Sequence, residues 1–122
     1  MKIIRTEVLQ EKGIIIPEIT STYDPVSKRN DGTITPLAPI VISGSNLDIK
    51  TADGFKLCLT PAIEYVRIID IPCVHTRSAG RLVISLPGLE PGEYFPAMLI
   101  ENRNGENSLY IFPVSWVVKY TF

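Results

Sequence analysis

The recurrence of proline and glycine along the chain is the feature that most limits its fold. Ten prolines and eight glycines are spread over 122 residues, and they separate short runs rich in Val, Ile, Tyr and Phe. Proline interrupts a helix because its ring removes a backbone donor and clashes with the preceding turn. The best helical candidate, residues 60–71, contains Pro61 and is dominated by Ile, Val and Tyr. This pattern predicts an all-β protein.

Two segments show the alternation of a strand with one buried face. In residues 80–86, Leu82, Ile84 and Leu86 fall on one side, and residues 55–60 alternate in the same way. Further strands are expected over residues 13–20, 38–43, 64–71, 93–102 and 108–120. About seven short strands at intervals of about 8–12 residues are typical of a β-sandwich, with a small closed barrel as the structural alternative.

Three dipeptides between these segments predict turns, since Asn, Asp and Gly accept a positive φ at low cost. They are Asp31-Gly32, Asp53-Gly54 and Asn104-Gly105. The third lies between the apolar runs 98–100 and 109–111, so it predicts a hairpin.

Length and charge narrow the function. The chain is long enough for one domain with a real core and too short for two of ordinary size. Lys and Arg total 12 against 13 for Asp and Glu, giving a net charge of -1. A DNA-binding domain carries a basic patch, so we expect no direct DNA contact. No apolar run approaches the roughly 18 residues that indicate a membrane span.

The first residues do not form a secretory signal. Lys2 and Arg5 precede Glu7, Gln10 and Glu11, which interrupt the sequence before an apolar stretch can develop. We therefore expect a cytoplasmic location.

A tyrosine corner is predicted at residues 89–94. Leu89, Pro91 and Gly92 stand between two expected strands, and Tyr94 lies near the start of the second. In immunoglobulin-like sandwiches a tyrosine in this place turns its hydroxyl back to the chain a few residues upstream. The alternative is an ordinary turn followed by a buried aromatic ring.

Together with residues 33–36, 40–47 and 82–94, this motif carries a family resemblance. The aliphatic strand 40–42 leads into Gly44-Ser45-Asn46-Leu47, and Leu82 to Leu86 leads into the Leu-Glu-Pro-Gly-Glu-Tyr turn. The chain resembles an Ig-like domain family of unknown function from Bacteroidota that commonly follows a histone-like, HU-type DNA-binding domain. The resemblance spans roughly residues 19–119 and implies an immunoglobulin-like fold and a nucleoid or DNA-associated scaffold. It supplies no catalytic residue.

We therefore expect an Ig-like β-sandwich domain over residues 19–122 and an N-terminal arm or edge strand over residues 1–18. The 18 residues of the arm are too few for an HU-type domain. The apolar residues of the arm are Ile3, Ile4, Val8 and Leu9. They would cover a sheet edge of their own domain or, as the alternative, add a strand to a neighbouring chain and form a homo-oligomer.

Candidate chemistry is sparse. Cys73 and His75 would share a strand face, and with Cys58 they could form part of a zinc site, although a structural site needs four ligands. A disulfide between Cys58 and Cys73 is the other alternative, and free cysteines are favoured. The serines lack a nucleophile elbow and the carboxylates are scattered. We expect no enzyme, no catalytic residues, no metal and no cofactor.

Aromatic residues of the last expected strand raise one binding hypothesis. Tyr110, Phe112 and Trp116 have even spacing, which favours a row in the core. If Pro113 breaks the register, Trp116 or Tyr110 would reach the surface and could bind a sugar or a protein.

The sequence thus predicts a non-catalytic binding or assembly module. It would act through a sheet edge or the loops at one end, with a protein as its partner. The alternative is a surface or envelope module for glycan or protein adhesion.

Overall fold

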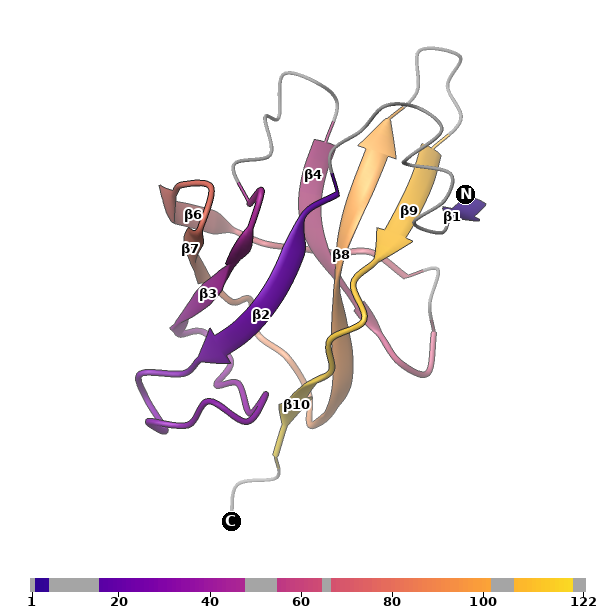
Figure 1. Ribbon diagram of the computed structural model, residues 1–122. Helices are drawn as coiled ribbons and strands as arrows, with labels where there is room; N and C mark the ends of the chain where they lie inside the picture. Colours follow the sequence, from indigo (N-terminus) through magenta and orange to yellow (C-terminus); the bar gives the residue numbers. More distant parts are fainter. Residues whose placement is uncertain (1, 5–15, 48–54, 65–66, 102–106, 120–122) are drawn as a thin grey trace.

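The computed structural model describes residues 2–4, 16–47, 55–64, 67–101 and 107–119. Within these ranges the chain forms ten strands and no helix (Figure 1). Their bounds are β1 Lys2–Ile4, β2 Glu18–Tyr23, β3 Pro39–Ser45, β4 Phe55–Pro61, β5 Ile69–Asp70, β6 Cys73–Arg77, β7 Arg81–Ser85, β8 Gly92–Glu101, β9 Asn107–Ile111 and β10 Trp116–Val118. No helix in the described ranges could therefore cross a membrane.

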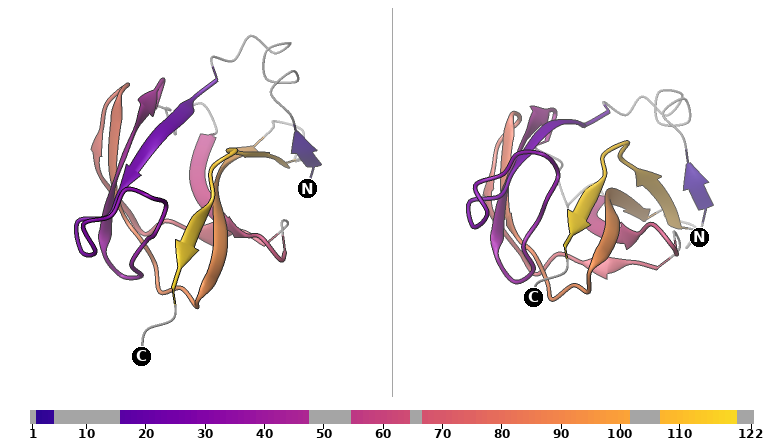
Figure 2. Two further views of the ribbon diagram at one scale, coloured as in Figure 1. Left: turned by 60° about the horizontal axis from the view of Figure 1, so that its bottom comes forward. Right: turned by 90° about the horizontal axis from the view of Figure 1, so that it is seen from below.

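The strands form two sheets that pack face to face (Figure 2). The six-stranded sheet has the order β1-β9-β8-β4-β5, with β10 paired to the first part of β8, and the four-stranded sheet has the order β2-β3-β7-β6. The runs β2-β3-β7-β6 and β4-β8-β9 match the ABED and CFG sheets of an immunoglobulin domain. The prediction of an immunoglobulin-like β-sandwich is confirmed. The strands outnumber the expected seven because several are only two or three residues long.

The core lies between the sheets and follows from strand alternation. Ile40 and Ile42 of β3 and Leu82 and Ile84 of β7 point inward, and all four are buried. The Trp116 indole is fully buried among them, and its Nε1 donates a hydrogen bond of 2.9 Å to Thr22 Oγ1. This bond joins β10 in one sheet to β2 in the other, so it satisfies two buried polar groups at once.

Gly44 permits a close approach within the four-stranded sheet. A Cβ on this residue would lie 1.8 Å from the Glu18 carbonyl oxygen of the neighbouring strand β2. Gly44 belongs to the segment Gly44 to Leu47, on which part of the family resemblance rests. The close approach of β2 explains why this position requires a glycine. Leu47 at its end is 1% exposed, and its amide donates to the Ala79 carbonyl.

Three strand predictions were wrong in extent. Of the described residues in the segment 64–71, only β5 is a strand, because a turn follows β4, with the Glu64 amide donating to the Pro61 carbonyl. The segment 108–120 divides into β9 and β10 around Pro113, which lacks a backbone donor. The first sandwich strand begins at Glu18 rather than residue 13, and residues 13–15 lie outside the described ranges.

The predicted hairpin is confirmed by the antiparallel pairing of β8 with β9, which ends at Glu101 opposite Asn107. Asn104-Gly105 and Asp53-Gly54 lie outside the described residues. At the Asp31-Gly32 turn, Gly32 has a φ of 91°, and an added Cβ would come within 2.7 Å of the Ser115 carbonyl oxygen. Glycine is required there on both grounds.

The N-terminal arm pairs within its own chain. β1 runs parallel to β9, with Ile3 opposite Leu109 and Ile4 opposite Tyr110. Ile4 is 5% exposed and packs with Met98 and Phe112 in a second core cluster. For residues 2–4 the structure agrees with the interpretation that the arm covers a sheet edge of its own domain. Val8 and Leu9 lie outside the described ranges.

Candidate functional site

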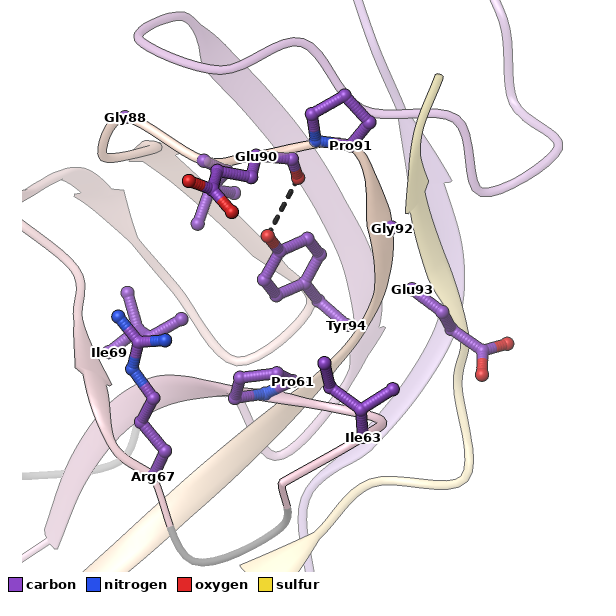
Figure 3. Close-up of a pocket in the computed structure, with 11 residues that line it drawn as sticks. Pro61, Ile63, Arg67, Ile69, Gly88, Glu90, Pro91, Gly92, Glu93 and Tyr94 are labelled. Carbon is purple, nitrogen blue, oxygen red and sulfur yellow. Dashed lines mark hydrogen bonds between the residues drawn. The ribbon is translucent and has the colours of Figure 1, made fainter. Parts of the chain in front are cut away.

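The tyrosine corner lies where the chain crosses from β7 in one sheet to β8 in the other. The Tyr94 hydroxyl donates a hydrogen bond of 2.7 Å to the Glu90 carbonyl, four residues upstream (Figure 3). This is the geometry that the sequence motif implies. Leu89 is partly buried against the main core, whereas Pro91 and Gly92 form the exposed turn. The four residues therefore act as a structural unit.

A groove of about 450 Å³ opens beside this corner. Figure 3 shows Glu90 and Tyr94 on one side of it and Pro61, Ile63 and Arg67 on the other. The walls come from two connections, β4 to β5 and β7 to β8. A backbone bond of 3.0 Å from the Ala62 amide to the Glu93 carbonyl fixes them to each other.

The groove lining mixes apolar and charged side chains. Pro61, Ile69 and Leu89 contribute hydrocarbon surface, and Ile63 is 98% exposed at the rim. Arg67 supplies a positive charge, and Glu90 and Glu93 supply negative charges. The Tyr94 hydroxyl donates its hydrogen bond to the Glu90 backbone carbonyl rather than into the groove.

The two aromatic binding candidates are buried. Trp116 is 0% exposed and Tyr110 is 6% exposed, so neither ring can contact a ligand at the surface. Tyr110 packs edge-on against Phe112, with ring centroids 5.3 Å apart. The core interpretation of this row is the one that the structure shows, even though Pro113 separates the two strands. The reason is that β10 pairs with β8 and keeps Trp116 inside the sandwich.

The zinc and disulfide alternatives both need the Cys58 and Cys73 side chains close together, and these lie on the outer faces of different sheets. Cys58 belongs to β4 in the six-stranded sheet and Cys73 to β6 in the four-stranded sheet, and both thiols are free. Among the described residues no group of three or more His, Cys, Asp or Glu side chains is placed to hold a metal. The favoured expectation of free cysteines is confirmed.

Cys58 is an inert thiol by its surroundings. Burial and, to a smaller extent, the Asp70 carboxylate raise its pKa to about 11, and Lys56 offsets part of this rise. Its side chain is 0% exposed and contacts Ala97, Leu99 and Leu109. A thiol that stays protonated and covered is a poor nucleophile.

Cys73 lies instead in a polar cluster that sequence reasoning had only half identified. Its sulfur is 3.6 Å from His75 Nδ1, and His75 Nε2 is hydrogen-bonded to Ser85 Oγ. The sequence placed Cys73 and His75 together because they are two residues apart. Ser85 could not be added from its position in the sequence, because the pairing of β6 with β7 is long-range information.

Asp24 is a buried carboxylate with a structural role. It is 0% exposed and accepts hydrogen bonds from the Val26 amide, Ser27 Oγ and Thr35 Oγ1 at 3.1, 2.8 and 2.7 Å. These three donors close the loop after β2. A carboxylate saturated in this way organises a loop and is not presented to a substrate.

Comparisons with known proteins agree with the fold. No family model matches the chain, and no curated protein matches it. The chain is similar to the crystal structure of a putative bacterial DNA binding protein from Bacteroides vulgatus, with a TM-score of 0.62 and 21% identity. The match covers 84% of this chain and 48% of that one, so this chain spans about half its length. A weaker match, with a TM-score of 0.38, 17% identity and coverage of 75% and 22%, is to a glucan-utilisation SGBP-B protein from Bacteroides ovatus in complex with a mixed-linkage heptasaccharide.

Proposed function

We propose that this domain is a non-catalytic assembly module that holds a segment of a partner protein in the groove beside Tyr94. The observation that carries the proposal is the 98% exposure of Ile63 at the rim of a groove that Pro61, Ile69 and Leu89 line in part. Exposed apolar surface that is continuous with a hollow is typical of an interaction site. A partner segment with apolar side chains and an acidic and a basic residue would match Arg67 and Glu90.

We further propose that the partner belongs to a DNA-associated scaffold. The support is the family resemblance of the sequence and the name of the Bacteroides vulgatus protein, a putative DNA binding protein, of which this fold covers 48%. The net charge of -1 favours an indirect role, since a domain that neutralises DNA phosphates needs a surplus of Lys and Arg.

The adhesion alternative depended on Trp116 and Tyr110, and their burial removes that reason for it. Tyr23, 42% exposed on β2, is the ring that a glycan would find in the described strands. It has no second exposed ring beside it in those strands, and sugar-stacking surfaces rely on an aromatic face that is open to the ligand.

The test is a cross-linking capture in cells of the native organism, with quantification by mass spectrometry. Ile63→Asp and Arg67→Glu should each reduce recovery of a partner that wild type captures, because they change the rim and the charge of the groove. Val26→Asp is the matched control, since Val26 is 60% exposed and does not line the groove. Equal recovery by wild type and Ile63→Asp would contradict the groove as the binding surface.

Direct DNA contact is tested separately by fluorescence anisotropy of a labelled duplex at low and physiological salt. We expect no saturable binding by the isolated domain. Binding that weakens steeply with salt would contradict the indirect role, because it would show release of counterions from phosphates. A glycan array with reproducible hits that Tyr23→Ala abolishes would favour the adhesion alternative.

A further inference from the structure

Cys73, His75 and Ser85 form a cluster on the outer face of the four-stranded sheet, and none of the three lines the groove. Cys73 and His75 lie on β6, and Ser85 lies on β7 directly opposite Cys73. Cys73 and His75 are exposed, and Ser85 is half-buried. The cluster is accessible to a reagent from solution.

A β-bulge brings the imidazole to this position. Val74 pairs with Ile84 and Thr76 pairs with Val83, so His75 is an extra residue without a partner on β7. In an unbulged strand pair it would stand opposite Val83. A bulge frees a residue from the regular pairing and re-aims its side chain, and here the His75 ring reaches back toward Ser85 and Cys73.

The two contacts of His75 define its chemistry. In the tautomer that carries a proton on Nε2, that nitrogen donates to Ser85 Oγ and leaves the Nδ1 lone pair facing the Cys73 thiol 3.6 Å away. Histidines that act as bases are commonly held in one tautomer by a partner on the second nitrogen. Ser85 occupies the place of that partner.

We propose that Cys73 is a thiol–disulfide exchange site for low-molecular-weight disulfides, with His75 as its general base and Ser85 as the residue that positions the imidazole. His75 Nδ1 takes the thiol proton, and the Cys73 sulfur attacks one sulfur of the disulfide. The Cys73–sulfur bond forms as the disulfide bond breaks, and the departing thiolate receives the proton from His75. The products are one mixed disulfide and one free thiol, so no further oxidant is needed.

An open sheet face suits this reaction. Exchange requires an unobstructed approach to the sulfur and a base beside it, without the enclosed pocket and oxyanion donors that acyl transfer needs. Cys58 lacks both features, since it is fully buried and its pKa is raised to about 11. Cys58 is therefore an unreactive reference thiol within the same molecule. On the reactive side, the charged residue on the same face of β7 as Ser85 is Arg81, which lies at the other end of that strand.

The test is the second-order rate of glutathionylation by glutathione disulfide, followed by intact mass spectrometry at neutral pH. Wild type and Cys58→Ala should form one adduct at the same rate, and Cys73→Ser should form none. His75→Gln should slow the reaction about a hundredfold, the lower end of what a positioned general base contributes. Ser85→Ala should slow it less, and Ser85→Thr should restore the rate because it keeps the hydroxyl.

A pH profile separates the base from a merely structural residue. At alkaline pH hydroxide removes the thiol proton without help, so the rates of wild type and His75→Gln should converge there. Circular dichroism and thermal melting establish that each variant is folded. Equal neutral-pH rates for wild type and His75→Gln, or modification of Cys58 alongside Cys73 in the folded protein, would overturn the proposal.

Discussion

The outer faces of the two sheets differ although the same alternation of residues builds both. On the six-stranded sheet, Cys58, Ala97, Leu99 and Leu109 face away from the sandwich core and are nevertheless 0–9% exposed, forming an outer cluster. On the four-stranded sheet the corresponding positions are half-buried or exposed, among them Val83 and Cys73. Strand alternation therefore determines which residues share a face of a sheet. Whether that face is shielded from water depends on the chain segments that pack over it.

The connection between β4 and β5 supplies part of the cover over the outer cluster. Ile68 packs against the outer cluster, and Thr60 Oγ1 at the end of β4 donates to the Glu64 carbonyl. Lys56 and Asp70 form an ion pair of 2.8 Å at the border of the same face. This connection also forms one wall of the groove, so the cover of the outer cluster and the proposed binding surface belong to one segment.

Of all the changes considered, truncation of Leu109 should cause the largest loss of stability, because Leu109 belongs to the buried outer cluster. Leu109→Ala removes buried hydrocarbon from the outer cluster and should lower the free energy of unfolding by about 2–5 kcal/mol. The matched change on the other face, Val83→Ala, should cost about 1 kcal/mol or less because Val83 is only half-buried. Urea unfolding with both variants measures the contrast, and equal losses would show that the outer cluster is no more a core than the open face.

The two cysteines allow the same comparison of the two outer faces with the exchange of a single atom, sulfur for oxygen. Cys58→Ser places a hydroxyl among apolar side chains and should destabilise the fold by about 1–3 kcal/mol. Cys73→Ser should stay within about 0.5 kcal/mol of wild type, because that side chain is exposed. Thermal melting under reducing conditions measures both, and Cys58→Ala separates the cost of the hydroxyl from that of lost volume. A Cys73→Ser loss as large as that of Cys58→Ser would refute the assignment of faces.

Much of the fold could be predicted from local patterns. The alternating residues 80–86 and 55–60 became β7 and β4, and β8 pairs with β9 as the predicted hairpin requires. The errors came from interactions that a local pattern does not contain. Pro113 divided one strand in two, and after the turn at Pro61 only two of the described residues in the segment 64–71 lie in a strand.

The candidate sites were harder to predict because they depend on pairing between distant strands. The tyrosine corner is local, with donor and acceptor four residues apart, and the sequence placed it well. The groove joins residues near 61–69 to residues 88–94, and the Cys73 cluster joins β6 to β7. For Trp116 and Tyr110 the sequence favoured the core and left surface binding as an alternative. Their burial, which follows from the pairing of β10 and β9 with β8, removes that alternative.

Tyr94→Phe tests the point where the chain passes between the two sheets. The substitution keeps the buried ring and removes the hydrogen bond to the Glu90 carbonyl. It should lower the free energy of unfolding by about 1 kcal/mol. Chemical denaturation measures this loss, with Tyr23→Phe as the control on an exposed ring. Equal stability of Tyr94→Phe and Tyr23→Phe would show that the Tyr94 hydrogen bond does not stabilise the crossing from β7 to β8.

The expected effect that is smallest near neutral pH is a dependence of stability on alkaline pH to which Cys58 contributes. Its pKa rises from an ordinary 9.0 to about 11 on folding, chiefly because burial disfavours the thiolate. The folded state therefore holds the proton more tightly than the unfolded state. The resulting stability is fully present below pH 9 and is lost as the pH rises toward 11, with a change below about 1 kcal/mol at the start of this window. Denaturation midpoints of wild type should fall over this range more than those of Cys58→Ala, whereas Cys73→Ser should follow wild type. Parallel curves for wild type and Cys58→Ala would mean that water reaches the outer cluster, and the two faces would then differ in composition without differing in their exclusion of solvent.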